Sequence, residues 1–374
     1  MDETSVKIKY ADLSASIIAP KYVVNRLKDE LSPFFKFDFA SDAVSLFHLV
    51  VRQEPCAEPI ATSYLRYEVA TSVAVDTSLY KHLASNGKRW GSDLEFCVEI
   101  ELYGTIIYFE RKSNRISLFQ QNAEYLAIDT IRTLKSLFTL SLERTGAIQV
   151  HSAAAVIDNK AVLLLGDMWQ GKTTILLELL SKFKAGQLSC DTLVIRSNPN
   201  GVVASGWPSP FSASHGTILH HKELHHALPA ERHHIGYSRL WTEGRKSVLT
   251  SKDIAEHLGT VIWPECSEIS EILILRFSPQ SPTEVSAPLN VDELRAALTS
   301  MYLGSRDPIY HNWHGFINVT KSEIDRNICQ MADQLSSKCV VRYFTWAPSA
   351  ESLLSTVPLL GQNHRSYGDI VKEI

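Results

Sequence analysis

The sequence has few cysteines, no long apolar run and no excess of positive charge. Its six cysteines are spread over 374 residues without a C-x-x-C pair, which argues against a disulfide scaffold and a cysteine zinc site. No stretch comes near a run of about 18 apolar residues, the length that indicates a membrane-spanning helix. The formal net charge of −4 argues against bulk nucleic-acid binding. We therefore expect neither a nucleic-acid partner nor a membrane partner.

The composition is that of an ordinary globular protein, with 45% hydrophobic and 21% charged residues. The first residues, Met1-Asp2-Glu3, do not begin a basic-then-apolar secretion signal, so we expect a cytoplasmic protein. A length of 374 residues exceeds the usual size of a single core and predicts two domains. A homo-oligomer is compatible with these features, and the oligomeric state stays open.

The most informative stretch is Ala161–Leu180, AVLLLGDMWQGKTTILLELL. It places G-x-x-x-x-G-K-T between an apolar run and a second apolar run at helical spacing. In this arrangement a strand leads into a loop whose backbone N–H groups surround a phosphate, and the next helix directs its positive end at the same phosphate. The alternative is a glycine-rich turn with an incidental lysine. The predicted nucleotide-binding residues are Gly166, Asp167, Met168, Trp169, Gln170, Gly171, Lys172, Thr173 and Thr174.

The expected ligands of this stretch are ATP and Mg²⁺. Lys172 would neutralise the β- and γ-phosphate oxygens, and Thr173 would offer its hydroxyl to Mg²⁺. Asp191 follows the loop helix beside an apolar run, where a carboxylate that organises Mg²⁺ or accepts a proton belongs. A turn aspartate that caps its own backbone is the alternative for Asp191.

Two cations downstream, Arg245 and Lys246, precede a predicted helix. Such a pair could clamp the transferred phosphoryl group, and Arg245 is therefore a candidate catalytic residue. A merely exposed pair of charges is the alternative.

Residues 215–234 contain seven of the fourteen histidines of the chain. His221 and His225 are four positions apart, as on one face of a helix, and could bind a metal ion. No acidic or cysteine partner at metal-binding spacing accompanies them in the sequence. A solvated, partly titrating flap beside an anionic substrate is the alternative that we favour.

The first third of the chain, residues 1–123, reads as a small, mainly antiparallel β domain of the α+β class. One helix is expected, Lys21–Phe35, because its apolar residues share one face. No catalytic group is evident here, and the strand edges could bind a peptide as an extra strand. Alternating apolar residues predict strands at Val44–Val51, Ser63–Ala70, Leu94–Ile100, Thr105–Arg111 and Arg115–Phe119.

Residues 124–374 alternate strands and helices and are expected to form an α/β domain that contains the phosphate loop. A hairpin of two strands feeds directly into that loop. The predicted helices are Glu124–Arg144, Lys252–Leu258, Asn290–Leu303, Ser322–Leu335 and Ala350–Leu360. The predicted strands are His151–Ile157, Ala161–Leu165, Thr192–Ile195, Glu271–Phe277 and Val340–Thr345.

Together these stretches resemble the P-loop catalytic domain of HPr kinase/phosphorylase, and more closely its relatives found beside peptide-modifying enzymes. The resemblance covers about residues 124–360 and rests on the His151–Val156 strand, the loop and Ser189-Cys190-Asp191. It implies ATP- and Mg²⁺-dependent phosphoryl transfer to a seryl or threonyl hydroxyl of a ribosomally made precursor peptide. The resemblance implies that Lys172 would hold phosphates and that Thr173 and Asp191 would hold Mg²⁺. Asp191 could instead meet the acceptor hydroxyl, and His151 would lie near the reacting phosphate.

The chain departs from the family at two positions. Cys190 stands where the family has a first aspartate, and Trp169 stands where its loop has a glycine. A missing general base would lower catalysis by roughly 10²–10⁴. A nucleotide-binding regulatory or partner protein, an ATPase or pseudokinase, and a small-molecule kinase are therefore the alternatives to a peptide or protein kinase.

Overall fold

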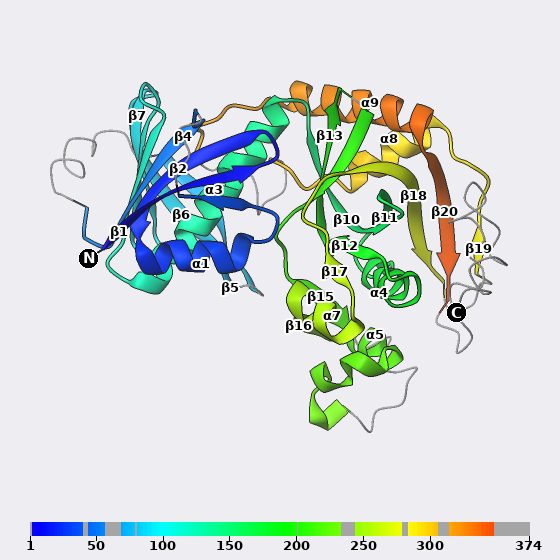
Figure 1. Cartoon of the computed structure of the whole chain (residues 1–374). Helices are drawn as coiled ribbons and strands as arrows, with labels where there is room; N and C mark the ends of the chain where they lie inside the picture. The colour runs from blue at the N-terminus through cyan, green and yellow to red at the C-terminus, as the bar shows by residue number, and fades with distance from the viewer. Residues whose placement is uncertain are drawn as a thin grey trace.

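The computed structural model describes residues 2–39, 44–56, 69–78, 81–199, 201–232, 244–278, 283–305 and 314–347. In these residues the chain forms two large β-sheets with helices packed on them (Figure 1). The protein is thus of the mixed α/β class. No helix among the described residues is long and apolar enough to cross a membrane.

The first sheet is built from the N-terminal part of the chain and has the order β3-β1-β2-β4-β9-β8-β7-β6-β5. Most neighbours are antiparallel, but β4 pairs in parallel with both β2 and β9. Its strands are β1 (Glu3–Tyr10), β2 (Leu13–Pro20), β3 (Lys36–Asp38), β4 (Phe47–Arg52), β5 (Val69–Ser78), β6 (Lys81–Gly91), β7 (Glu95–Ile100), β8 (Thr105–Glu110) and β9 (Arg115–Phe119).

Two helices pack on the first sheet, α1 (Lys21–Leu31) and α3 (Ala123–Arg144). The helix α1 ends four residues before the predicted Phe35, because Ser32 precedes a proline and takes an extended conformation. The helix α3 buries Leu134 and Phe138 in the core of the first sheet, where the Phe138 ring lies 5.5 Å from that of Phe47. Its apolar residues therefore belong largely to the N-terminal core, while the division of the chain at residue 123 stays a prediction.

The second sheet has the order β17-β12-β10-β13-β14-β18-β20-β19, and β11 pairs with both β10 and β18. The strands β11, β18 and β20 run parallel, so their carboxyl ends share one edge. Its strands are β10 (Ile148–Ile157), β11 (Lys160–Leu165), β12 (Gly186–Ser189), β13 (Thr192–Asn198), β14 (Gly201–Gly206), β17 (Val261–Ile262), β18 (Ser267–Phe277), β19 (Glu284–Val285) and β20 (Val340–Trp346).

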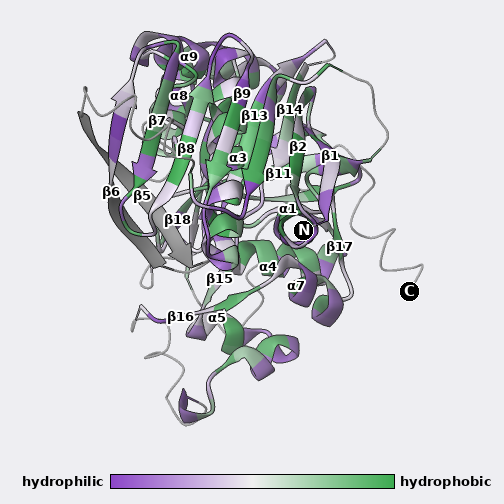
Figure 2. Cartoon of the chain, turned by 90° about the vertical axis from the view of Figure 1, so that its left-hand side faces the viewer, coloured by the Kyte–Doolittle hydropathy of each residue, from purple (hydrophilic) through white to green (hydrophobic). Residues whose placement is uncertain are grey.

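Helices cover both faces of the second sheet (Figure 1). Alternate residues of β11 point to opposite faces: Val162 and Leu164 pack on one side, and Leu163 and Leu165 on the other. On the first side lie α4 (Lys172–Phe183), α5 (His215–His220) and α7 (Ser251–Leu258), and on the second side lie α8 (Val291–Ser300) and α9 (Lys321–Lys338). In Figure 2 the strands β13 and β14 are mainly hydrophobic, whereas hydrophilic residues mark the outer turns of α7 and α9.

The predicted hairpin before the phosphate loop is confirmed. The strands β10 and β11 pair antiparallel from Ser152 and Leu165 to Ile157 and Lys160. The turn residues Asp158 and Asn159 both have positive φ, 50° and 64°, which suits a two-residue hairpin turn.

Some predicted elements differ from the structure or lie outside it. The sequence did not predict the paired strands β1 and β2 or the long strands β5 and β6. The predicted helix Ala350–Leu360 and most of the predicted strand Ser63–Ala70 lie outside the described residues.

A short segment between β14 and β15 (Phe211–Ser214) joins the two sheets. The Trp207 ring packs 5.0 Å from that of Tyr10, and the Tyr10 hydroxyl donates to the Gly206 carbonyl oxygen at 2.9 Å. From α3, the Lys135 ammonium donates to the Pro208 carbonyl oxygen at 2.8 Å. The N-terminal part of the chain therefore supports the segment that leads to the candidate site.

Candidate functional site

The predicted phosphate loop connects β11 to α4 at the carboxyl edge of the parallel strands, where ligands bind in open α/β sheets. Gly171 precedes the helix with a φ of 89°, in the left-handed region. A Cβ at Gly171 would lie 1.9 Å from a ring carbon of Trp346. The Trp346 ring Nε1 donates to the Gln170 carbonyl oxygen at 2.7 Å. The end of β20 thus holds the loop in a form that only glycine fits.

Other loop residues brace the loop or face outward. The Gln170 side chain accepts from the Phe277 backbone N–H at 2.7 Å, which ties the loop to β18. The backbone of Trp169 takes a φ of 72°, a conformation that residues other than glycine rarely adopt. Its ring is 45% exposed, and the Lys246 ammonium lies 4.4 Å above it. At the position where the resembling family has glycine, this chain keeps the glycine-like backbone and adds an aromatic face.

Lys172 is buried within the loop, with 7% of its surface exposed. Its ammonium donates to the carbonyl oxygens of Gly166 at 2.7 Å and Asp167 at 3.1 Å. Burial lowers the pKa of Lys172 to about 8, although the charge of Asp191 opposes this. The Lys172 side chain is therefore mostly charged at neutral pH, and it lies beside the space that the loop encloses.

The threonines after Lys172 connect α4 to the next layer. The Thr173 hydroxyl donates to the Ser212 carbonyl oxygen at 3.1 Å. The hydroxyls of Thr174 and Thr217 lie 2.8 Å apart, and Thr217 meets the Ser214 hydroxyl at the same distance. This chain of hydroxyls fastens β15 and α5 to the start of α4.

A cleft with a volume of about 460 Å³ lies in front of the loop. It collects six of the nine predicted nucleotide-binding residues, while Gly166, Asp167 and Gln170 support the loop from behind. Its lining consists of His151, Met168, Trp169, Gly171, Lys172, Thr173, Thr174, Cys190, Asp191, Ser212, Ser214, Thr217, Gly244, Lys246, Phe277 and Trp346.

A histidine and a carboxylate form part of the wall that faces the loop. His151 on β10 places its Nε2 3.1 Å from Oδ1 of Asp191, whose side chain is 49% exposed. Partial burial raises the pKa of Asp191, but the hydrogen bond and charge of His151 and the ammonium groups of Lys172 and Lys246 outweigh it. The net effect is a lowered pKa, so Asp191 presents an ionised carboxylate to the cleft.

The two candidate cations downstream lie in different places. Lys246, in β16 (Lys246–Leu249), lines the cleft. Arg245 is exposed and does not line it; its carbonyl oxygen accepts from the His215 backbone N–H at 3.2 Å. Of the pair, Lys246 is the one placed to meet a phosphate.

Cys190 lines the cleft but turns its sulfur away from solvent. Its Sγ lies 3.4 Å from the Ser209 carbonyl oxygen and 3.6 Å from that of Pro210, and the residue is 6% exposed. Burial, together with the charge of Asp191, raises the pKa of the Cys190 thiol to about 12. The thiol therefore stays protonated and cannot replace an aspartate as a base.

Several lining residues were missed by sequence reasoning. Trp346 and Phe277 end parallel strands, and a strand end beside a phosphate loop is the signal that could have found them. Ser212, Ser214 and Thr217 come from a loop-rich region whose pairing with β16 has no local signature.

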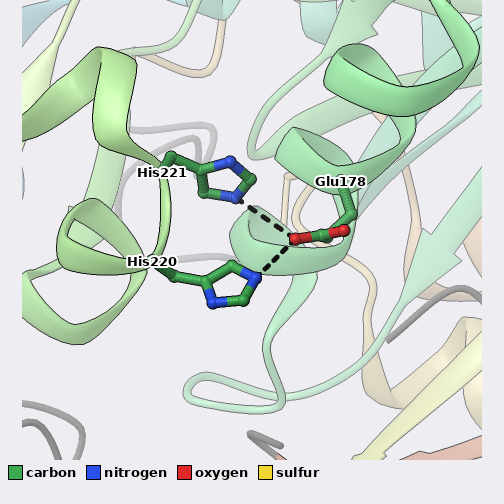
Figure 3. Close-up of side chains that lie close together, drawn as sticks. All are labelled: Glu178, His220 and His221. Atoms are coloured by element: carbon green, nitrogen blue, oxygen red, sulfur yellow. Dashed lines mark hydrogen bonds and ion pairs between the residues drawn. The ribbon is translucent and has the colours of Figure 1, made fainter. Parts of the chain in front are cut away.

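The expected pairing of His221 with His225 is not what the structure shows. His225 donates through Nε2 to the Leu219 carbonyl oxygen at 2.9 Å. Instead, His220 and His221 both face Glu178 of α4 (Figure 3). The acidic partner of these two histidines comes from a helix some 40 residues earlier in the chain, so sequence spacing could not indicate it.

Comparisons with known proteins give likenesses among solved structures alone. No family model matches the sequence, and no curated protein matches it either. Among solved structures, the Hpr(Ser) kinase/phosphatase from Coxiella burnetii matches with 14% sequence identity over 37% of this chain and 70% of that chain, with a TM-score of 0.20. The likeness concerns part of the fold.

Proposed function

We propose that this chain is an ATP-dependent phosphotransferase that acts on a seryl or threonyl hydroxyl of a peptide or protein. One observation carries the proposal: the Asp191 carboxylate, hydrogen-bonded to His151 at 3.1 Å, lines the same cleft as Lys172 of the phosphate loop. A cleft that can hold a triphosphate beside an ionised carboxylate has the two parts that transfer to a hydroxyl requires.

The phosphate end of the cleft is supported by backbone and charge. The start of α4 directs its N–H groups and its positive end toward the loop. Lys172 is held there by carbonyl oxygens that a phosphate oxygen would replace as acceptor. Lys246 adds a second ammonium to the same cleft. These groups together stabilise negative charge on the transferred group.

The residues in the cleft fit a Mg²⁺ ion. The Thr173 hydroxyl and the Asp191 carboxylate both line it, and hard oxygen donors of this kind are the ligands that Mg²⁺ prefers. We propose that these two residues hold the ion. When bound, Mg²⁺ would neutralise charge on the β- and γ-phosphate oxygens.

The transfer itself needs little from the protein beyond position and charge. The acceptor hydroxyl oxygen forms a bond to the γ-phosphorus, and the bond from that phosphorus to the bridging oxygen breaks, so that ADP leaves. The hydroxyl proton passes to the Asp191 carboxylate. His151 orients this carboxylate through its Nε2. Lys172 and Lys246 stabilise the charge that the phosphoryl oxygens carry during transfer.

A peptide or protein acceptor is favoured by the N-terminal sheet. The strand β3 lies at one end of the sheet order and pairs with β1 on one side. An edge strand of this kind can bind an extended peptide through main-chain hydrogen bonds. The sequence resemblance to kinases found beside peptide-modifying enzymes points to a ribosomally made precursor peptide.

The test is label transfer from γ-labelled ATP in the presence of Mg²⁺ to an array of peptides containing serine or threonine, with small hydroxyl compounds in parallel. Lys172→Ala should abolish nucleotide binding and transfer. Asp191→Asn should leave nucleotide affinity within a few-fold but lower transfer by roughly 10²–10⁴. Lys184→Gln, which changes an exposed lysine just after α4, is the matched control and should behave as wild type. Undiminished transfer by Asp191→Asn would contradict the assignment.

A second candidate is a nucleotide-binding regulatory protein that does not transfer phosphate. The observation that favours it is Cys190, because Asp191 is the one carboxylate among the described residues that line the cleft. Stoichiometric ATP binding without label transfer to any peptide or small hydroxyl compound would support this alternative.

A further inference from the structure

A second cluster of polar side chains lies outside the cleft, between α4 and α5. Glu178 of α4 is 2% exposed, and its Oε1 lies 2.6 Å from Nε2 of His220 and 3.8 Å from Nε2 of His221 (Figure 3). The three ligand atoms lie within 4.8 Å of one another. Both imidazole rings point the same nitrogen at the same carboxylate oxygen.

His221 supplies an independent observation. The residue is 5% exposed, and its Nε2 has no hydrogen-bond partner within the part of the chain that the structure describes. A buried polar nitrogen normally has a partner, since leaving it without one costs about 1–3 kcal/mol. This nitrogen faces the Glu178 carboxylate beside the His220 ring (Figure 3).

We infer that Glu178, His220 and His221 form a binding site for a divalent transition metal ion of the zinc type. Two imidazole nitrogens and one carboxylate oxygen are a common set of protein ligands for zinc, and a fourth position stays open to water. Zinc–ligand distances of about 2.0–2.1 Å in a tetrahedron separate the ligand atoms by about 3.3 Å. The observed separations from Glu178 Oε1, 2.6 and 3.8 Å, lie on either side of this value.

The two oxygens of Glu178 are divided between two tasks. The Lys182 ammonium lies 2.6 Å from Oε2, while both histidines face Oε1. Lys182 thus orients the carboxylate and leaves Oε1 for the ion, in the manner of the outer partners that fix metal ligands.

The position of the site gives it a structural role. Glu178 belongs to the same helix as Lys172, and α5 is already fastened to α4 by the Thr174 and Thr217 hydroxyls. A metal ion would add a second fastening at the other end of α5. The histidine-rich stretch that begins with α5 would then be fixed to the helix of the phosphate loop. This inference does not depend on phosphoryl transfer.

The test uses the full chain after removal of metal with a chelator, titrated with Co²⁺ and then Zn²⁺. We expect one Co²⁺ per chain with the visible absorption of a four- or five-coordinate site, displaced by Zn²⁺ but not by excess Mg²⁺. Glu178→Gln and His221→Asn should each weaken Co²⁺ binding at least roughly 100-fold, because losing a ligand costs no less than losing an outer partner. Circular dichroism checks that each variant is folded, and either folded variant alone decides the question.

Two histidine variants serve as matched controls. His225→Gln changes the residue that the sequence pairs with His221, and His226→Asn changes an exposed histidine of the same segment. Both should keep the Co²⁺ affinity of wild type. Absence of Co²⁺ and Zn²⁺ binding at micromolar concentrations would overturn the inference. Co²⁺ binding of wild-type affinity in either folded variant, Glu178→Gln or His221→Asn, would overturn it as well.

Discussion

The two walls of the cleft differ in how they are built. The loop wall comes from one continuous stretch, in which β11, the residues from Gly166 to Gly171, and α4 follow one another directly. The facing wall is assembled from His151, Asp191 and Lys246, which come from three separate segments. The loop wall follows a widespread pattern for binding phosphate, whereas the facing wall departs from the resembling family at Cys190. The comparison indicates that the proposed nucleotide binding is encoded by local sequence, whereas the proposed phosphoryl transfer depends on residues that only the tertiary structure brings together.

The loop wall nevertheless relies on the contact between Gly171 and the distant Trp346. Among the substitutions that test this comparison, Gly171→Ala is therefore expected to lower the free energy of unfolding most. The new Cβ would meet Trp346 at 1.9 Å and would also be strained at a φ of 89°. Overpacking and strain together cost about 3 kcal/mol, which corresponds to roughly a 100-fold loss of nucleotide affinity if the loop gives way. Equilibrium unfolding and a fluorescent-nucleotide titration measure the two quantities.

Gly146→Ala is the matched control for this prediction. Gly146 follows α3 with a φ of 91°, but nothing lies within 4 Å of the added Cβ. This variant should lose only about 1 kcal/mol of stability, from strain alone, and no nucleotide affinity. Equal effects at the two glycines would show that contact with Trp346 does not hold the loop.

The part of the site that the sequence predicts is the part that local pattern encodes. The glycine and lysine spacing of the loop, the hairpin before it and the helix after it can all be read from neighbouring residues. The contact of Gly171 with Trp346 joins residues 175 positions apart, and the approach of Glu178 to His220 requires α5 to fold back on α4. Such contacts depend on how the elements pack, and apolar periodicity carries no information about them.

The N-terminal sheet shows the same difference between features set by local sequence and features set by distant contacts. The predicted strands Thr105–Arg111 and Arg115–Phe119 agree closely with β8 and β9, because each is a short run rich in apolar residues beside a tight turn. The placement of β4 between β2 and β9 joins segments far apart in the chain and could not be read from the sequence. The same holds for α3, whose apolar face gives no indication of which sheet it covers.

The facing wall can be tested with Cys190→Asp, which introduces the aspartate that the resembling family has at this position. The side chain at this position points at the carbonyl oxygens of Ser209 and Pro210, which cannot donate to a carboxylate, and the nearby Ser209 hydroxyl already donates to the Trp207 carbonyl oxygen at 3.3 Å. We therefore expect a loss of about 2–3 kcal/mol in the free energy of unfolding and no gain in phosphoryl transfer. Cys190→Ser, which keeps a small donor at the same position, is the control and should change stability by less than about 1 kcal/mol. Faster transfer by the aspartate variant would show that the facing wall lacks only this carboxylate.

The charge of Lys172 links the two walls, and its titration gives a smaller, graded effect. Because burial lowers the pKa of Lys172 to about 8, the free protein loses this positive charge above that pH. Phosphate binds the protonated form, so nucleotide affinity should be constant between about pH 7 and 8. Above this it should fall by up to tenfold, about 1.4 kcal/mol, per pH unit.

Lys172→Arg provides the control for the pH profile. A guanidinium stays charged throughout this range, so the affinity of the variant, even where lower, should not change between pH 7 and 9.5. A wild-type profile that is equally flat would contradict the assigned pKa of Lys172.

The smallest effect is expected at Trp169, where the loop itself departs from the family. Trp169→Gly relieves the strain of a φ of 72°, worth about 1 kcal/mol, but removes the contact between the ring and Lys246 at 4.4 Å, worth about 0.5–1 kcal/mol at an exposed position. The free energy of unfolding should therefore change by less than about 1 kcal/mol. Trp169→Ala also loses the ring but keeps the strain, so it should be less stable than the glycine variant by about 1 kcal/mol in denaturant unfolding. If the two variants were equally stable, the loop at this position would not need a glycine-like backbone. Tryptophan would then differ from the glycine of the resembling family only in the aromatic surface that it adds to the cleft.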